Sequence, residues 1–240
     1  MLPDSFGTPA VPHPLVVVGK EGPIYLLNRD DLGGFQQGPE GTCVDQSGNA
    51  GDDIAGSFAF PGTPGVWATP AMWPGDGGSI YVPNPTFFGA ENAGKLTSYN
   101  VVGIGGQPTL SLAGQSSDSF GYGSSSAVVT STGSTSGSAL VWVTFFPVNP
   151  GQQQNAELRA YDANPSGGVL TLRGSWPIGT GNKFTTPTVH DGRVYVVGRD
   201  GTANGRVFGF GVGGTAATQA PARGPSIAAV PPDAGPDREG

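Results

Sequence analysis

Short apolar runs recur along the whole chain, and each run is bounded by glycine, proline, asparagine or aspartate. β-Branched and aromatic residues dominate these runs, which is typical of short strands that end in tight turns. No stretch of ten or more residues shows an apolar period of 3.6, so we expect helix to be almost absent. The pattern predicts an all-β protein.

A unit of about 60 residues recurs four times, and such a period is typical of repeat architectures. Each copy has an entry of small residues, a β-rich hydrophobic run and a partly alternating run that carries an aromatic residue. The entries begin near residues 8, 69, 125 and 186. The hydrophobic runs are 15–18, 80–82, 140–143 and 194–197, and the final runs are 24–27, 96–99, 158–161 and 207–210. Aligning the second entry residue makes Pro9, Pro70, Ser126 and Pro187 equivalent.

A unit of three or four short strands forms a small antiparallel sheet with two apolar faces. Stacking such sheets radially buries both faces, which is how a β-propeller is built. The turn residues support this arrangement. Glycine supplies the positive φ of tight hairpins, and it stands between strand runs at Gly22, Asp191-Gly192 and Asp200-Gly201. We therefore predict about four blades, each a four-stranded antiparallel sheet.

Two segments fall outside this pattern. Residues 33–64 form the longest irregular stretch, in which we expect a loop and a short outer strand near 57–60. Residues 213–240 are rich in proline, alanine and glycine, and their composition indicates a disordered linker or tail. The predicted organisation is blades over 1–212 and a tail over 213–240.

The charge balance narrows the choice of partner. The net charge of −7 and the pI near 4.6 disfavour nucleic acids and anionic membranes. No apolar run approaches the roughly 20 residues of a membrane span. Charged residues make up only 12% of the chain, a share common in exported proteins, so we expect an extracellular or periplasmic location. The first residues do not resemble a signal peptide, and we expect an export signal to lie upstream.

Three strings carry a resemblance to a known family: "VVVGKEGPIYLLNRDDLGGF" (16–35), "GVWATPAMW" (65–73) and "NKFTTPTVHDGRVYVVGRDG" (182–201). They resemble blades of the quinoprotein-like propellers, the superfamily with pyrroloquinoline-quinone (PQQ) type repeats. The resemblance covers residues 8–211 in separate islands. It implies part of a seven- or eight-bladed propeller, completed by further blades of a parent chain or by a second copy.

Enzymes of that superfamily hold Ca²⁺ through Glu, Asn and Asp side chains and stack the quinone on a tryptophan, and many cover it with a vicinal disulfide. This chain has a single cysteine, Cys43, and no such Glu and Asn set beside its four tryptophans. We expect Trp67 and Trp73, next to the Thr69-Pro70 entry, to pack between neighbouring blades. No cofactor is therefore expected, and PQQ with Ca²⁺ stays an alternative.

One loop concentrates oxygen donors, namely Asp45, Asn49, Asp52 and Asp53. Ca²⁺ takes six to eight oxygen ligands on flexible loops, so these four residues are a candidate Ca²⁺ site. Their spacing differs from that of an EF-hand loop, and a solvated acidic loop is the alternative.

The two histidines do not suggest catalysis. His190 and Asp191 could act as a base and its orienting group, but adjacent residues at a strand end point to opposite sides, so we expect no pairing. His13 stands between two prolines. We expect no catalytic residues in this chain.

Ligands of propellers tend to lie where inner strand ends converge on one rim. Lys20, Arg29, Arg199 and Asp200 are the polar residues nearest such ends, and they are the candidate ligand-binding residues, with exposed turn charges as the alternative. The sequence thus predicts a non-catalytic binding or scaffold module for a protein, glycan or small ligand. The other hypothesis is a piece of a PQQ-dependent oxidoreductase, a dehydrogenase whose catalytic residues lie outside this chain.

Overall fold

A computed structural model describes residues 1–20, 22–30, 32, 58–60, 65–84, 94–104, 106–148, 154–199 and 205–211, with only the backbone at 58–60 and 104. Fifteen strands and one short 3₁₀ turn, Asp4–Phe6, account for the regular structure of these residues. The predicted all-β class and the near absence of helix are confirmed. No described helix has the length and apolar character needed to cross a membrane.

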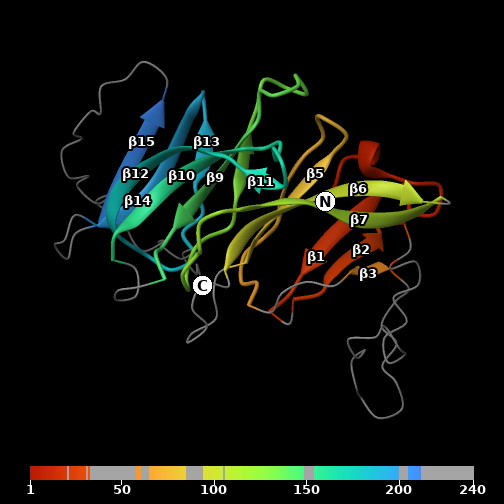
Figure 1. The fold of residues 1–240 in the computed structure, drawn as a ribbon, viewed down its shortest axis with the longest axis horizontal. Helices are drawn as coiled ribbons and strands as arrows, with labels where there is room; N and C mark the ends of the chain where they lie inside the picture. The colour runs from red at the N-terminus through yellow and green to blue at the C-terminus, as the bar shows by residue number, and fades with distance from the viewer. Residues whose placement is uncertain are drawn as a thin grey trace, which may run out of the picture.

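The strands form antiparallel units that follow one another along the long axis of the molecule (Figure 1). The first unit contains β1 (Pro14–Val18), β2 (Ile24–Asn28) and β3 (Phe58–Phe60). The second contains β4 (Ala71–Trp73), β5 (Ser79–Asn84), β6 (Lys95–Ile104) and β7 (Gln107–Ser116), with β11 (Val169–Leu170) added in parallel to β7.

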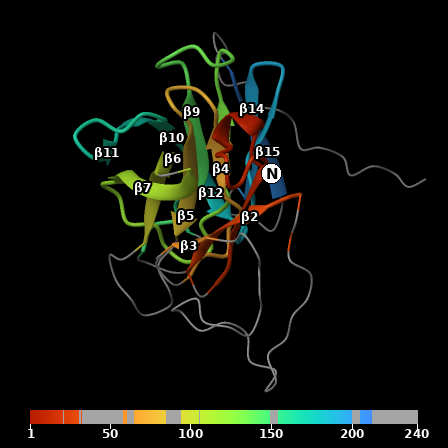
Figure 2. The ribbon, with the colours of Figure 1, turned by 90° about the vertical axis from the view of Figure 1, so that its right-hand side faces the viewer.

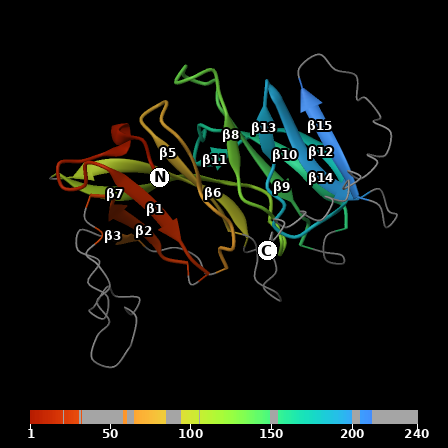
Figure 3. The same ribbon diagram turned by 180° about the vertical axis from the view of Figure 1, so that it is seen from behind.

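The remaining strands belong to the largest sheet, which is built from two units. One contains β8 (Val128–Thr130), β9 (Leu140–Phe145), β10 (Ala156–Asp162) and β12 (Leu172–Gly181), and the other contains β13 (Thr188–His190), β14 (Arg193–Arg199) and β15 (Gly205–Gly211). Only the ends of β12 and β14 pair, at Gly179–Gly181. Figures 1 and 3 both place β1–β3 and β13–β15 at opposite ends of the stack, and Figure 2 views it end-on.

Strand alternation explains why these units stack. On β5, Ile80 and Val82 face a core shared with the first unit, whereas Tyr81 faces a core shared with the third. On β9, Val141 and Val143 face that same core from the other side. Because successive side chains of a strand point to opposite faces, an inner sheet is apolar on both faces and needs a neighbour on each.

A third core lies between the last two units. It contains Leu158 and Ile178 from the third unit and Val194 and Val196 from β14. Three apolar cores thus separate the four units, and β4, β8 and β13, the first strands of the last three units, lie near one another. This stacking is compatible with part of a propeller, as the repeats predict.

The predicted hydrophobic and final runs all lie in strands, whereas the predicted Asp200-Gly201 turn lies outside the described residues. The short outer strand expected near 57–60 is β3. Asp191 and Gly192 have φ values of 47° and 67° and join β13 to β14 in a two-residue hairpin. A turn of this kind needs positive φ at both central residues, and glycine and aspartate accept it at little cost.

The first entry was predicted wrongly. Thr8-Pro9-Ala10-Val11 reads like the entries that lead into β4 and β13, but it forms a tight turn. The amide of Thr8 donates to the carbonyl of Val11, the amide of Val11 donates back to the carbonyl of Thr8, and the amide of Ala10 donates to the carbonyl of Gly106. The first unit therefore has no described inner strand equivalent to β4, β8 and β13.

Candidate functional site

The open edge of β1 is the feature that distinguishes the first unit. Arg29 donates its amide to the carbonyl of His13, and these residues lie opposite each other in the β1–β2 register. Antiparallel pairs alternate between bonded and non-bonded, so Leu15 and Val17 also bond to β2. The amide and carbonyl of Val16 and Val18 must then point to the opposite edge of β1.

Both ends of that edge are already closed. At one end, the amide of Leu2 donates to the carbonyl of Pro14 at 3.1 Å, and at the other the amide of Gly65 donates to the carbonyl of Lys20 at 2.8 Å. Among the described residues, none bonds to the backbone of Val16 or Val18 on this side. Within the described part of the chain, the β1 edge is therefore unpaired between the hydrogen bonds at Pro14 and Lys20.

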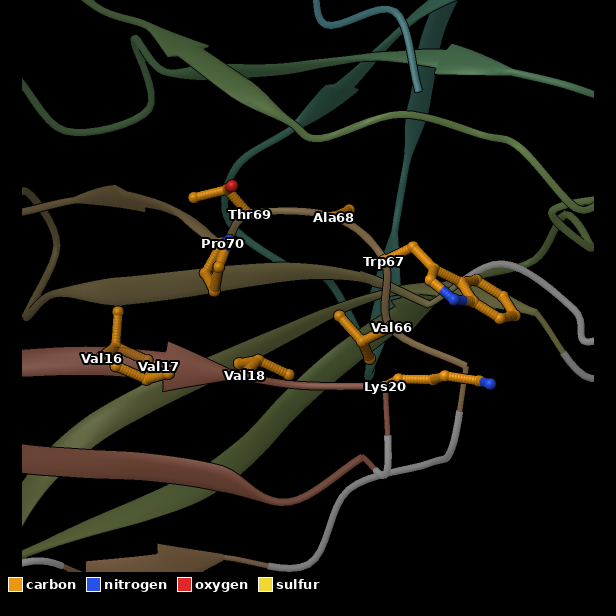
Figure 4. Close-up of a pocket in the computed structure, with 9 residues that line it drawn as sticks. All are labelled: Val16, Val17, Val18, Lys20, Val66, Trp67, Ala68, Thr69 and Pro70. Carbon is orange, nitrogen blue, oxygen red and sulfur yellow. The ribbon is translucent and has the colours of Figure 1, made fainter. Parts of the chain in front are cut away.

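A groove of about 400 Å³ lies along this unpaired stretch. One wall is β1 with Lys20, and the other is the segment that runs into β4. Figure 4 shows the two walls passing each other, with Trp67 and Lys20 extending from the same end. The lining residues are Val16, Val17, Val18, Lys20, Val66, Trp67, Ala68, Thr69 and Pro70. Apart from Lys20, Trp67 and Thr69, these side chains are aliphatic, so an entering ligand meets aliphatic side chains, the outward backbone groups of Val16 and Val18, and one ammonium group.

An aromatic cluster continues from Trp67 into the next units. The ring of Trp67 packs edge-on against Tyr122 at 5.0 Å between centroids, and Phe184 lies 6.4 Å from it. The Lys183 ammonium stands 4.8 Å above the Tyr122 ring, within the range of a cation–π contact. Tyr122 precedes β8 and Phe184 precedes β13, so three units meet here. The expectation that Trp67 packs between units is confirmed.

Trp73 also packs between units, as predicted. Its side chain is 2% exposed, and its indole N–H donates to the carbonyl of Gly133 at 3.1 Å. The other two tryptophans, Trp142 and Trp176, stack on each other with centroids 5.6 Å apart. All four indole rings therefore contribute to packing.

The candidate ligand-binding residues lie apart from one another. Lys20 is exposed in the groove. Arg29 lies at the opposite end of the β1–β2 hairpin, where its guanidinium pairs with Asp4 at 3.0 Å. Arg199 ends β14, at the far end of the stack, and Asp200 lies outside the described residues. Lys20 and Arg29 do not share a rim, because an antiparallel hairpin places the C-terminal ends of its two strands on opposite sides.

The predicted Ca²⁺ ligands cannot be placed. Asp45, Asn49, Asp52 and Asp53 all lie outside the described residues, so this site stays a prediction. Within the described ranges, no cluster of three or more His, Cys, Asp or Glu side chains could hold a metal ion.

The expectation about His190 was wrong. Its Nε2 atom lies 3.2 Å from Oδ2 of Asp191, so the two side chains do pair. The left-handed backbone of Asp191, with φ of 47°, turns its side chain out of the alternation that a strand would impose. Both side chains are about three-quarters exposed. The pair lies in an open hairpin turn and does not line the groove.

Sequence reasoning missed a charged cluster that joins the second and third units. Arg159 on β10 pairs with Asp118 at 2.9 Å and with Glu157 at 2.7 Å, and its guanidinium covers the ring of Phe145. The Tyr161 hydroxyl donates to Asp118 at 2.9 Å, and burial raises the pKa of that tyrosine. Glu157, Arg159 and Tyr161 alternate along one strand, whereas Asp118 lies about 40 positions away, so no sequence pattern pointed to Asp118.

Comparisons with protein-family models, with curated proteins and with solved structures found no match to this chain.

Proposed function

We propose that this chain is a non-catalytic binding module made of propeller blades, and that its ligand lies in the groove between β1 and residues 66–70. The observation that carries the proposal is the gap at the inner edge of the first unit. In the other three units a strand fills this position, and here a groove of about 400 Å³ takes its place. That volume lies within the range of ligand pockets.

The lining chemistry indicates the kind of ligand. Valine side chains and Pro70 favour an apolar body, because burying apolar surface drives association. Lys20 adds one ammonium at the end where Trp67 lies, and it favours an anionic group. We infer a ligand with an apolar stem and a carboxylate.

The described histidines do not support a catalytic role for this groove. His13 Nδ1 lies 2.6 Å from Asp30, at the end of β1 away from Lys20, and His190 lies in a turn of the last unit. A general base must be within hydrogen-bond reach of the reacting group. Neither histidine lines the groove, which favours binding over catalysis at this position.

A matched pair of small probes tests the proposal. We would titrate the ¹⁵N-labelled protein with 4-phenylbutyrate and with neutral 4-phenylbutyramide. The carboxylate should shift the Trp67 indole and the Val16–Val18 amides, and it should bind several-fold more tightly than the amide. Lys20→Glu should remove the preference for the carboxylate. Arg199→Glu, the same charge change at the far end of the stack, should leave it intact.

Two results would contradict the proposal. Either the shifts map outside the groove, or Lys20→Glu and Arg199→Glu behave alike. The quinoprotein alternative has its own test, a titration with PQQ and CaCl₂ followed by absorbance. A saturable spectral change that Trp67→Phe abolishes would favour that alternative over a non-catalytic module.

A further inference from the structure

We propose that the groove receives an extended peptide segment of a partner protein, which adds to β1 as an antiparallel strand and places an acidic residue at its N-terminal end, next to Lys20. This inference rests on the proposed function and names its ligand class. It follows from the backbone of β1, from the strands that fill the same position elsewhere in the chain, and from the charge at one end of the groove.

The backbone argument comes first. The amides and carbonyls of Val16 and Val18 face the groove, while Leu2 and Gly65 close the edge on either side. A strand edge with unpaired groups is a template for another strand. Strand addition to such an edge uses main-chain hydrogen bonds for affinity and alternate side chains for specificity. The open stretch accepts a short segment, because only Leu15 to Gly19 lie between the closed positions Pro14 and Lys20.

The chain itself shows what fits there. β4, β8 and β13 are each three residues long, and each pairs antiparallel with the next strand of its unit. Their central residues are Met72, Val129 and Val189. An equivalent strand on β1 would place its central residue opposite Val17, whose side chain is 42% exposed. A β-branched residue at that position would cover this surface.

Charge sets the direction of the partner. A strand antiparallel to β1 has its N-terminal end beside Lys20. The Lys20 side chain is exposed, and no described carboxylate pairs with it. An acidic residue at the start of the segment would therefore gain an ion pair without competing with one inside the protein. The inferred ligand is an extended segment with an acidic residue followed by small and β-branched residues.

The probe peptide is acetyl-Asp-Thr-Val-Thr-Ser-amide, with its valine opposite Val17 and its aspartate opposite Gly19, next to Lys20. We expect saturating peptide to slow hydrogen exchange at the Val16 and Val18 amides at least tenfold. The Val17 amide is already bonded to β2 and should change much less. This alternation follows from the geometry of strand addition, and non-specific contact with the groove would not produce it.

Matched variants separate the contributions. N-methylation of the two peptide threonines removes the amides that face β1 and should abolish binding. Val16→Pro removes one outward amide without removing a β1–β2 bond, and it should weaken binding at least tenfold. Lys20→Glu should weaken binding of the Asp peptide and strengthen binding of a Lys-for-Asp peptide. If Val16→Pro does not fold, the reversed peptide preference of Lys20→Glu still tests whether the peptide binds beside Lys20.

Three outcomes would overturn the inference. The first is that the N-methylated peptide binds as well as its parent, and the second is that hydrogen exchange slows equally at Val16, Val17 and Val18. The third is that the free protein self-associates through this edge and that Val16→Pro abolishes the self-association. The last result would identify a second copy as the occupant. If the peptide fails but 4-phenylbutyrate still shifts the groove resonances, only this inference falls. If both fail, the proposed function falls with it.

Discussion

Trp73 donates its indole N–H to the backbone carbonyl of Gly133 across the boundary between the second and third units, at a distance of 3.1 Å. The side chain is 2% exposed and belongs to the core that joins these units. A single buried ring thus contributes both apolar contact and a polar bond between two repeats. Their stacking should depend on it.

We expect Trp73→Phe to destabilise the protein by about 2–4 kcal/mol, because it removes ring volume from a packed core and leaves a carbonyl without its donor. Urea unfolding followed by circular dichroism measures the change. Val207→Ala, at an exposed position of β15, serves as the control and should stay within about 0.5 kcal/mol. Equal midpoints for the two variants would show that Trp73 does not hold the units together.

Gly198 should be irreplaceable where β14 meets β12. A Cβ atom at this position would lie 2.2 Å from the carbonyl oxygen of Ile178, which is backbone and has little freedom to move. We expect Gly198→Ala to cost about 2–4 kcal/mol by forcing the two strands apart. Gly205→Ala is the matched control on β15, because nothing lies within 4 Å of its added Cβ. A cost for Gly198→Ala no greater than that of Gly205→Ala would refute the close approach.

The ion pair between Asp118 and Arg159 should contribute far more than an exposed one. Asp118 forms an ion pair with Arg159 and accepts a hydrogen bond from the Tyr161 hydroxyl, each at 2.9 Å, and the Arg159 side chain is only 12% exposed. Asp118→Asn removes one of the two negative charges beside this mostly buried guanidinium. It should lower the free energy of unfolding, measured by chemical denaturation, by about 2–4 kcal/mol. Asp162→Asn breaks an exposed pair with Arg173 and should cost under about 0.5 kcal/mol. A similar loss of unfolding free energy in both variants would contradict a larger contribution from the Asp118–Arg159 pair.

Stability should fall at alkaline pH because of Tyr81. Burial raises the pKa of its phenol to about 12, above the value near 10 of an unfolded tyrosine. The folded state therefore resists loss of this proton. Its contribution to stability is complete below pH 10 and disappears between pH 10 and 12, by roughly 1.4 kcal/mol for each pH unit.

Unfolding free energies measured by urea titration between pH 9 and pH 11.5 would show this loss. Tyr81→Phe removes the hydroxyl that donates to the carbonyl of Ala163, so it should be less stable near neutral pH by about 1 kcal/mol. The variant should also lose less stability on going to pH 11.5. A parallel alkaline decline in both proteins would exclude Tyr81 as a cause.

The strands could be predicted because each apolar run carries its own signal. The runs at 80–82, 140–143 and 194–197 lie in β5, β9 and β14, at matching positions of their units. The alignment of the entries is off by one residue in the third unit. Met72, Val129 and Val189 occupy equivalent positions, so Ala127 and not Ser126 matches Pro70. Serines replace the Thr-Pro pair there, and they gave no fixed point for the alignment.

The open edge of β1 could not be predicted from the sequence. Its entry resembles the others in residue type, and the turn that it forms is held in part by a contact with Gly106, almost a hundred positions away. Arg29 does not lie beside Lys20 for a related reason. Nearness to a strand end says nothing about which end of the sheet a residue occupies.

Residue-specific hydrogen exchange of the free protein tests most directly that the first unit lacks its inner strand. On β1, we expect slow exchange at Leu15 and Val17 and fast exchange at Val16 and Val18, because only the first two bond to β2. On β5, which has β4 and β6 on its two sides, Ile80 and Tyr81 should both exchange slowly. Uniform protection along β1, or alternation along β5, would contradict the open edge.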